Sequence, residues 1–427
     1  MSPNRATLAS LALGLGLAAT VAAGGCAVDP HGPAHPPDLL DYPVGVTAGP
    51  SGRYVWVTSG NFDLAYGGGA VLALDVLTHR FVPGAAAEVG SFPGAVTLRT
   101  DAAGALTDGY VLARETNGLY HLRYGLSDDG LPTVSCDGGA RQPNGTMRCL
   151  DTQIEYLDVP APEGGGAKVR LKVGPDPVAA LLHPGHEAAE PELLLTAAMV
   201  DGNTATFTLG DDGAPTLVGN ADLDDGLYAF AEQPHTHQIY ATSKSLNALI
   251  VLALQAPAPT DAPSTNPYLR VLRRVAIPDA LAGDRARELA FTADGTRLLA
   301  TYRAPSSVAV FDVSADASGH AADTFVAKIP VGARPGGLTV APATPGAPEL
   351  AYVACFGADR VDVVDPALGV VVDSVPTGHG PFGVALVDQP ALGVRRLYVT
   401  EFYDQAVGVI ELDPTSPYYH QLIAEVR

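Results

Sequence analysis

A short motif recurs seven times along this chain, and the spacing of its copies restricts the fold more than any other feature of the sequence. Five copies read Pro-x-[Gly/Ala]-apolar, and two looser copies lack the proline. The copies begin at residues 43, 93, 177, 227, 288, 335 and 381. Most copies are therefore 46 to 61 residues apart, and one step is 84 residues long. Such spacing predicts seven units of one structure rather than several independent domains.

Within each unit, the motif is followed by further short apolar segments that are separated by turns. In the sixth unit these segments cover residues 351–353, 361–365 and 370–375. Four short strands in about 50 residues are typical of a β-propeller blade and leave no room for parallel βαβ units. The predicted fold class is all-β, a seven-bladed β-propeller with four-stranded antiparallel blades over residues 42–427, with a Cys-bounded insertion at about 125–165. The sequence leaves open whether a strand near 418–426 completes the seventh blade alone or pairs with residues 38–41.

The second strand of several units carries a recognisable motif. Tyr398-Val399-Thr400-Glu401, with similar segments at 240–243 and 352–355, resembles the Tyr-Val-Thr-Asn motif of YVTN-type β-propeller repeats. This resemblance implies a propeller fold. The asparagine of the motif is absent from every copy, so a role for that side chain does not carry over. Propellers serve both as binding proteins and as enzymes, so the resemblance implies no single function.

The first 25 residues are typical of a secretory signal peptide, because Arg5 is followed by a small and apolar run over residues 6–23. Residues 21–26 resemble the lipobox of bacterial lipoproteins, with Ala23 where leucine is usual. This resemblance implies a lipid on Cys26, a tether over residues 26–41 and, because Ala27 follows, an outer-membrane lipoprotein that faces the periplasm or the cell surface. Ordinary cleavage near Ala23 and retention of the run as a membrane anchor are the alternatives.

The cysteines agree with export. Cys136 and Cys149 lie in one turn-rich loop, and in an oxidising compartment they are expected to form a disulfide. A metal site would need two further ligands nearby, and the loop contains no histidine. Cys355 lies in an apolar strand pattern and is expected to be a buried free thiol.

The charge balance restricts the partners. The chain has 25 Lys and Arg against 46 Asp and Glu, which gives a formal net charge of −21. Binding to a nucleic-acid backbone requires a basic surface, so this balance argues against nucleic acid as a partner. The predicted partners are a small molecule, a peptide or an envelope protein, together with a membrane through the N-terminal lipid anchor. We expect a monomer and predict no cofactor.

Candidate ligand-binding residues follow from the position of loops in a propeller. The loops that join strand four to strand one, and strand two to strand three, share the face on which ligands usually bind. Several charged or polar residues fall in these positions and would converge around the axis: Arg114, Asp176, Arg287, Tyr302, Arg334, His379 and Glu401. Convergent polar groups on a rigid scaffold favour a ligand site, and solvated loop residues with local ion pairs are the alternative.

The predicted function is a lipid-anchored envelope propeller that acts as a ligand-binding or protein-interaction scaffold. The alternative is a propeller hydrolase of the lactonase class, since some propellers that hydrolyse sugar lactones resemble this architecture. Two sets of residues fit the two chemistries that this resemblance implies: a cation held by Glu401, Asp176 and Asn61, or His379 as a base with Arg114 or Arg334. No residue is assigned a catalytic role.

Two pairs of histidines occupy turns between strands one and two of adjacent units. These are His183 with His186, and His235 with His237. Paired histidines are a signal for zinc or copper, but histidines in turns are commonly only polar. We therefore assign no metal ligand, and the sequence leaves open whether these turns bind metal.

Overall fold

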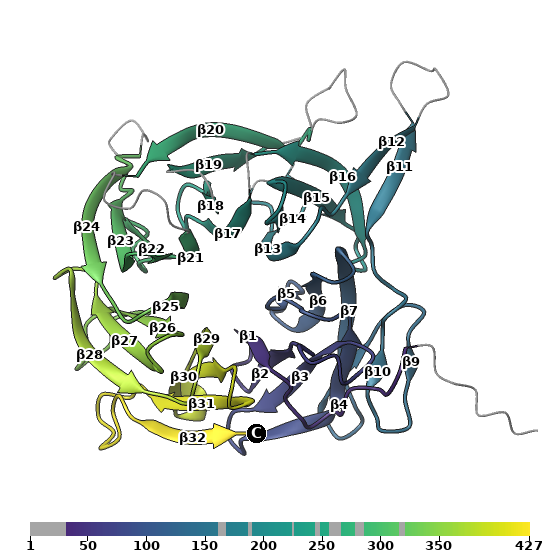
Figure 1. The fold of residues 1–427 in the computed structure, drawn as a ribbon, viewed down its shortest axis with the longest axis horizontal. Helices are drawn as coiled ribbons and strands as arrows, with labels where there is room; N and C mark the ends of the chain where they lie inside the picture. Colours follow the sequence, from purple (N-terminus) through teal and green to yellow (C-terminus); the bar gives the residue numbers. More distant parts are fainter. Residues whose placement is uncertain are drawn as a thin grey trace, which may run out of the picture.

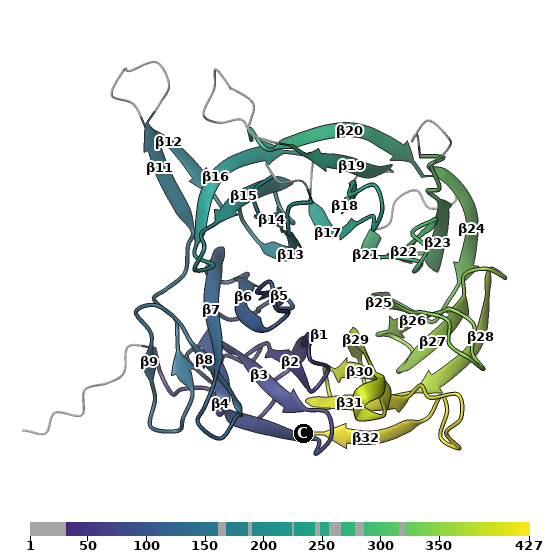
Figure 2. The ribbon, with the colours of Figure 1, turned by 180° about the vertical axis from the view of Figure 1, so that it is seen from behind.

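The computed structural model shows a ring of sheets around a central axis (Figures 1 and 2). The structure describes residues 31–160, 168–186, 190–223, 226–243, 248–255, 266–277, 286–315 and 321–427. The predicted signal peptide and Cys26 lie outside these residues. Within them, no helix is long and apolar enough to cross a membrane.

The predicted seven-bladed β-propeller is confirmed. Each blade is an antiparallel sheet whose four strands pair in chain order. The strands of the seven blades are, in order, β1–β4 (Pro43–Ala48, Tyr54–Ser59, Gly69–Asp75, Arg80–Val89), β5–β8 (Thr97–Thr100, Leu106–Ala113, Gly118–Leu126, Pro132–Ser135), β13–β16 (Pro177–His183, Leu193–Ala198, Asn203–Leu209, Pro215–Asp222), β17–β20 (Leu227–Glu232, Ile239–Ser243, Ala248–Leu254, Leu269–Ala276), β21–β24 (Ala286–Phe291, Arg297–Arg303, Ser306–Asp312, Thr324–Pro330), β25–β28 (Pro335–Ala341, Leu350–Cys355, Arg360–Asp365, Val370–Pro376) and β29–β32 (Pro381–Gln389, Val394–Glu401, Ala406–Glu411, Leu422–Val426).

The ring closes without strand exchange. The last strand, β32, pairs with β31, so the seventh blade is built entirely from the C-terminal part of the chain. Residues 38–41 form no strand, but Leu40 is fully buried in the cluster between the seventh and first blades. The first and last blades are therefore joined by side-chain packing.

The core is divided into seven hydrophobic clusters, and each lies between two neighbouring blades. Val, Leu and Ala side chains make up most of these clusters, in which adjacent sheets pack face to face. An aromatic residue near the middle of the second strand adds a polar contact in four blades, where its hydroxyl meets the next blade. The pairs are Tyr110 with the Gly213 carbonyl (2.7 Å), Tyr240 with Asp323 (2.6 Å), Tyr352 with His420 (3.1 Å) and Tyr398 with the Val76 carbonyl (3.4 Å).

The long step in the repeat spacing is an insertion after the second blade. Its short strands β9 (Ala140–Arg141) and β10 (Met147–Arg148) extend the first blade, because β10 pairs in parallel with β4. The strands β11 (Tyr156–Pro160) and β12 (Lys168–Lys172) form a hairpin outside the ring (Figure 1).

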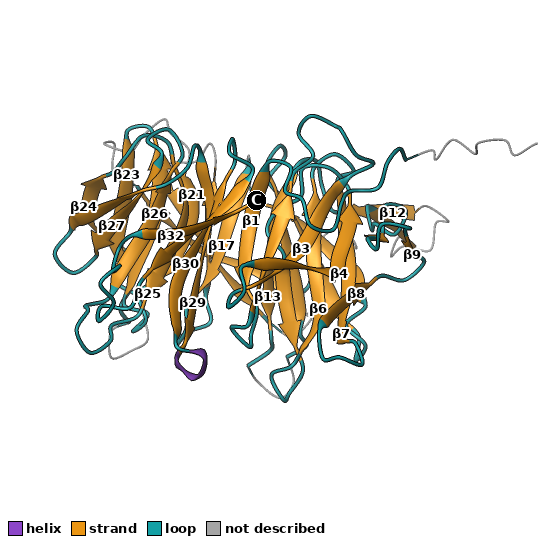
Figure 3. Ribbon diagram, turned by 90° about the horizontal axis from the view of Figure 1, so that it is seen from below, coloured by secondary structure: helices purple, strands orange, loops and turns teal. Residues whose placement is uncertain are grey.

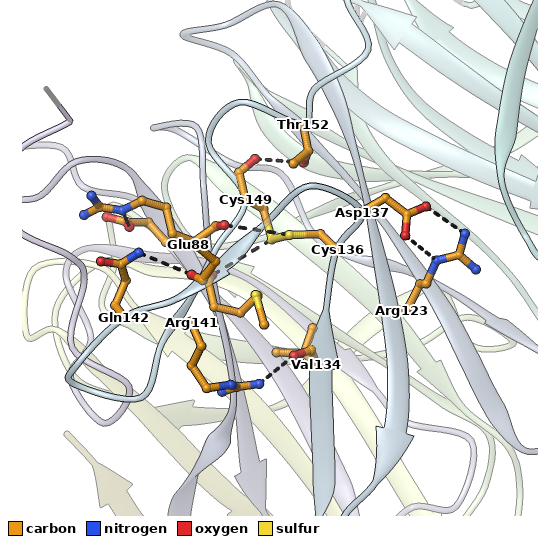
Figure 4. Close-up of a disulfide and its surroundings, with 12 residues drawn as sticks. Glu88, Arg123, Val134, Cys136, Asp137, Arg141, Gln142, Cys149 and Thr152 are labelled. Carbon is orange, nitrogen blue, oxygen red and sulfur yellow. Dashed lines mark hydrogen bonds and ion pairs between the residues drawn. A yellow bond between two sulfur atoms is a disulfide. The ribbon is translucent and has the colours of Figure 1, made fainter. Parts of the chain in front are cut away.

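The predicted disulfide between Cys136 and Cys149 is present (Figure 4). Cys136 follows the outer strand of the second blade, and Cys149 follows β10 at the edge of the first blade. The disulfide therefore joins the outer edges of two blades. Cys355 is buried and free, as predicted.

The described part of the predicted tether, residues 31–41, is packed against the first blade and the insertion. Glu88 on β4 is fully buried, and it accepts hydrogen bonds from Arg148 Nε (2.6 Å) and from the His35 backbone (3.1 Å). Thr146 of the insertion donates to the His35 carbonyl (2.7 Å). The imidazole of His35 is also buried, and this burial lowers its pKa to about 4. These contacts hold the segment against the ring.

Candidate functional site

The inner strands enclose a cavity of about 450 Å³ around the axis of the ring. Small residues on the inner strands make room for it. At Gly45, a Cβ atom would lie 2.5 Å from the Ala95 Cα atom, so the neighbouring blades approach too closely there for a side chain. The cavity opens toward the loops that precede the inner strands. Figure 3 shows the ring from the side, and the helical turn η2 (Pro390–Leu392), between β29 and β30, marks the opposite face.

The chain enters each inner strand through a left-handed backbone conformation. In the six blades where this position is described, the residue has a φ between 50° and 72°: Tyr42, Phe92, Asp176, Gly226, Arg334 and Gly380. Non-glycine residues seldom adopt this conformation, so its repetition is a property of the blade. It brings each loop back toward the axis at the mouth of the cavity.

The residue that follows the second strand faces the cavity in several blades. Arg114, Met199, Arg303, Phe356 and Phe402 occupy or adjoin this position, and all five line the cavity. The predicted residues Tyr302 and Glu401 lie one place before the cavity residues Arg303 and Phe402. A shift of one residue along a strand turns the side chain to the other face of the sheet.

Two of the predicted ligand-binding residues, Arg114 and Arg287, line the cavity. Arg114 forms an ion pair with Asp176, which is also on the predicted list. The guanidinium of Arg287 lies over the ring of Tyr228, 4.2 Å from its centre. Arg334 lies over the ring of Phe356, a cavity residue, at 4.9 Å. Four predicted residues therefore lie at the cavity or beside it.

The other three predicted residues do not line the cavity. Tyr302 is buried in the cluster between the fourth and fifth blades, and its hydroxyl has no hydrogen-bond partner among the residues that the structure describes. His379 is 70% exposed and contacts Asp404 (3.0 Å), which raises the pKa of the imidazole. Glu401 is fully buried within the seventh blade. Its Oε1 accepts a hydrogen bond from the Gly378 amide (2.9 Å), and Oε2 has no hydrogen-bond partner among the described residues. Burial raises the pKa of Glu401 to about 7.

In the structure, the residues of the two sets that we considered for lactone chemistry contact other groups. The amide of Asn61 is buried and bonded to Ser91 and to the Tyr66 backbone. It is therefore held apart from Glu401 and Asp176, which have partners of their own. His379 is paired with Asp404, whereas Arg114 is paired with Asp176.

Sequence reasoning missed Glu288, which also lines the cavity. In the fifth blade Ala286 pairs with Tyr302, just as Pro43 pairs with Ser59 in the first. The fifth copy of the motif therefore begins two residues before the predicted position 288. Glu288 then occupies the place that Gly or Ala takes in the other blades. An alignment of the second strands of the blades would have placed Glu288 correctly, whereas the fifth copy of the motif has no proline to align.

The electrostatics of the cavity differ from those of the whole chain. Burial raises the pKa of Glu288 to about 7, and the neighbouring Arg287 opposes this rise. Three guanidinium groups, those of Arg114, Arg287 and Arg303, line one cavity in a chain whose formal net charge is −21. Phe62, Phe92, Phe356, Phe382 and Phe402 supply apolar walls. The cavity thus combines cationic groups with aromatic rings in one space.

Together, the fold and this cavity define a β-propeller with a ligand-sized axial site. No family model matches the chain, so the resemblance to YVTN-type repeats stays a prediction. No curated protein matches it either.

Solved structures with the same fold include several propellers of different function. Hydrazine synthase of Kuenenia stuttgartiensis aligns with a TM-score of 0.56 at 16% identity, covering 87% of this chain and 96% of that one. A putative 6-phosphogluconolactonase of Bacteroides uniformis also has a TM-score of 0.56 at 16% identity, covering 79% and 86%. The periplasmic gluconolactonase of Pseudomonas aeruginosa has a TM-score of 0.54 at 16% identity, with the same coverage. At such identities the likeness shows the fold alone.

Proposed function

We propose that the axial cavity binds a small organic anion, so that the protein acts as a ligand-binding propeller. The observation that carries this proposal is the gathering of Arg114, Arg287 and Arg303 at one cavity in a strongly acidic chain. A guanidinium group offers parallel donors that match a carboxylate or phosphate. The phenylalanine rings can pack against the remainder of the ligand. The volume of about 450 Å³ is within the range of small-molecule sites.

The proposal is tested by calorimetry with gluconate and benzoate, each compared with a neutral counterpart, glucose and benzyl alcohol. We expect at least one of the two anions to bind, and its neutral counterpart to bind at least about tenfold more weakly, because charge recognition dominates. Arg287→Ala is expected to reduce the affinity for the anion by a similar factor. The matched control is Arg170→Ala, because Arg170 pairs with Asp158 on the hairpin outside the ring. Equal binding of neutral and charged probes, or of neither anion, would contradict the proposal.

One observation favours hydrolysis of a lactone as a second candidate function. Glu288 has a pKa of about 7, so near neutral pH its carboxylate can accept a proton from water. The water oxygen would bond to the acyl carbon while the ring C–O bond breaks, and Glu288 would return the proton to the leaving oxygen. A guanidinium in the cavity would stabilise the negative charge on the carbonyl oxygen. Two of the similar folds are described as gluconolactonases, one of them putative.

This second candidate is tested by measuring gluconolactone hydrolysis above the spontaneous rate. The rate is expected to rise with pH through about 7, as Glu288 loses its proton. Glu288→Gln is expected to remove the catalysed rate, whereas Glu349→Gln is expected to keep it, because Glu349 binds the Ala293 amide on the other face. A catalysed rate that persists in Glu288→Gln would exclude this mechanism.

We further propose that the protein is exported and lipid-anchored through Cys26 as a monomer of the outer membrane. The disulfide supports an oxidising compartment, because structural disulfides are rare in the cytosol. Mass spectrometry of the mature N-terminus tests the anchor. A diacylated cysteine at position 26 is the expected result, and an unmodified residue at another position would contradict it.

A further inference from the structure

On the face opposite the mouth, three histidines and a carboxylate meet between the third and fourth blades. His183 ends β13, and Glu232 ends β17, the inner strand of the next blade. Glu232 Oε2 lies 3.0 Å from His183 Nδ1, and Oε1 lies 2.6 Å from His186 Nε2. His237 Nδ1 lies 3.1 Å from the same Oε1. The two turns that carried the histidine pairs in the sequence are therefore brought together at one carboxylate.

One ring nitrogen of the cluster, His183 Nε2, takes no part in the hydrogen bonds between the cluster residues. His183 is 3% exposed, and within the described part of the chain its Nε2 has no hydrogen-bond partner. The nearby Glu190 oxygen lies 3.8 Å from this nitrogen, beyond hydrogen-bond distance. A buried polar atom without a partner costs free energy, so it points to a partner such as a cation. His183 can bind one through Nε2 without first breaking a hydrogen bond.

Two of the imidazole rings in the cluster also pack against each other. The ring of His186 is stacked on that of His237, with 3.3 Å between their centres. This stacking holds the two imidazoles side by side at the Glu232 carboxylate. Neutral imidazole is the form that binds metal ions.

We propose that His183, His186 and Glu232 bind a divalent transition-metal ion, with Zn²⁺ as the best match. Each residue offers one ligand atom, and these atoms lie within 4.8 Å of one another. Ligands of a tetrahedral zinc ion are about 3.4 Å apart, given bonds of about 2.1 Å. The side chains therefore need only small movements to close around an ion. Imidazole nitrogens with one carboxylate select zinc, copper or nickel over magnesium and calcium, which prefer oxygen ligands alone.

Such an ion would link two blades whose junction lacks a contact present elsewhere. Leu195 occupies the position in the third blade that Tyr110, Tyr240, Tyr352 and Tyr398 occupy in their blades, so no hydroxyl reaches the fourth blade from it. His183 and His186 belong to the third blade, whereas Glu232 belongs to the fourth. A metal bound by all three would cross-link this junction. The site lies away from the mouth, so this inference does not depend on the proposed function of the cavity.

The test is calorimetric titration of the full chain, purified without a polyhistidine tag, with ZnCl₂ and with MgCl₂. We expect a single Zn²⁺ to bind, Mg²⁺ to produce no response, and the thermal midpoint to rise with Zn²⁺. His186→Gln and Glu232→Gln are each expected to weaken Zn²⁺ binding at least about tenfold. The matched control is His235→Gln, on the same turn as His237, because His235 Nε2 contacts the Asp294 carbonyl in the next blade (3.0 Å). This variant is expected to bind Zn²⁺ like the unaltered chain.

A second measurement does not depend on the folding of any variant. Addition of Co²⁺ to the unaltered chain is expected to give the intense visible absorption of a low-symmetry site with nitrogen ligands, and Zn²⁺ is expected to abolish it. The proposal is overturned if Zn²⁺ does not bind, or if folded His186→Gln binds it with unchanged affinity. In either case the imidazoles serve only to hold the Glu232 carboxylate.

Discussion

At the scale of single residues, the end of the second strand is a buried position whose chemistry differs between blades. Ser59 there bonds to the Asp41 backbone, and the Cys355 thiol contacts Asp362. In the seventh blade the same position holds Glu401, whose buried Oε2 has no hydrogen-bond partner in the described ranges of the chain. A neutral group suits this place better than a carboxylate, which explains why the pKa of Glu401 is raised to about 7.

This position supports a prediction about pH. Between the ordinary pKa of 4.5 and the raised value of about 7, the folded state binds a proton at Glu401 that the unfolded chain releases. Stability from this group is therefore present at low pH and lost as the pH rises through about 7. Glu401→Gln stays neutral, so it is expected to raise the free energy of unfolding by on the order of 2 kcal/mol at pH 8 and by little at pH 4.5. Urea denaturation at the two pH values measures the difference, and an equal effect at both would contradict it.

At the scale of elements, the first blade has an edge that the insertion and the N-terminal segment cover. An uncovered outer strand offers unpaired backbone groups, and β10 pairs with part of β4. The ion pair between Glu88 and Arg148 joins these two strands in a place where both side chains are nearly excluded from water. The disulfide then fixes the end of β10 to the second blade.

The ion pair provides a prediction for this edge. Arg148→Met leaves the Glu88 carboxylate buried without its cation, and is expected to lower the free energy of unfolding by about 3–5 kcal/mol. The double variant Glu88→Gln with Arg148→Met removes both charges and is expected to recover a large part of that loss. Chemical denaturation of the unaltered chain, the two single variants and the double variant measures the coupling. If the double variant is as unstable as the sum of its single changes, the charge argument does not hold.

The sequence repeat determines the number of blades, but it does not determine which side chains face the cavity. The spacing of the motif predicted the number of blades, because turns and short apolar strands are local features. The direction of a side chain at the mouth depends on the register of its strand. The prediction was one residue out of register in the seventh blade, so it named Glu401, whereas Phe402 faces the cavity. Glu288 was missed because the fifth copy has no proline to fix its start. The meeting of His183 and Glu232 arises from packing between blades, which no local pattern reports.

At the scale of the whole molecule, the ring is held by seven junctions of one kind. The junction between the seventh and first blades is a hydrophobic cluster like the others, and Tyr398 reaches across it to the Val76 carbonyl. Among the described strands, none from one end of the chain completes a blade from the other end. Closure therefore depends on the same packing that joins any two blades.

This similarity predicts that the closing junction is no weaker than an internal one. Tyr398→Ala is expected to lower the free energy of unfolding by about 3–5 kcal/mol, the usual cost of removing a buried aromatic side chain. Tyr240→Ala, at the junction between the fourth and fifth blades, is expected to cost a similar amount. Urea denaturation followed by tyrosine fluorescence and by circular dichroism measures both. A second transition found only in Tyr398→Ala would show that the ring opens first at its seam.

The left-handed residue at the entry to each inner strand has a consequence for how such a ring can diversify. Because the backbone turns the same way whether the residue is Gly226 or Arg334, the chain can exchange its side chain there while the frame stays fixed. Each non-glycine choice costs about 1–2 kcal/mol of backbone strain, which a large ring can tolerate. The side chains at these entry positions can therefore differ between related rings that share one backbone. A library randomised at these positions alone would sample new ligands without redesigning the scaffold.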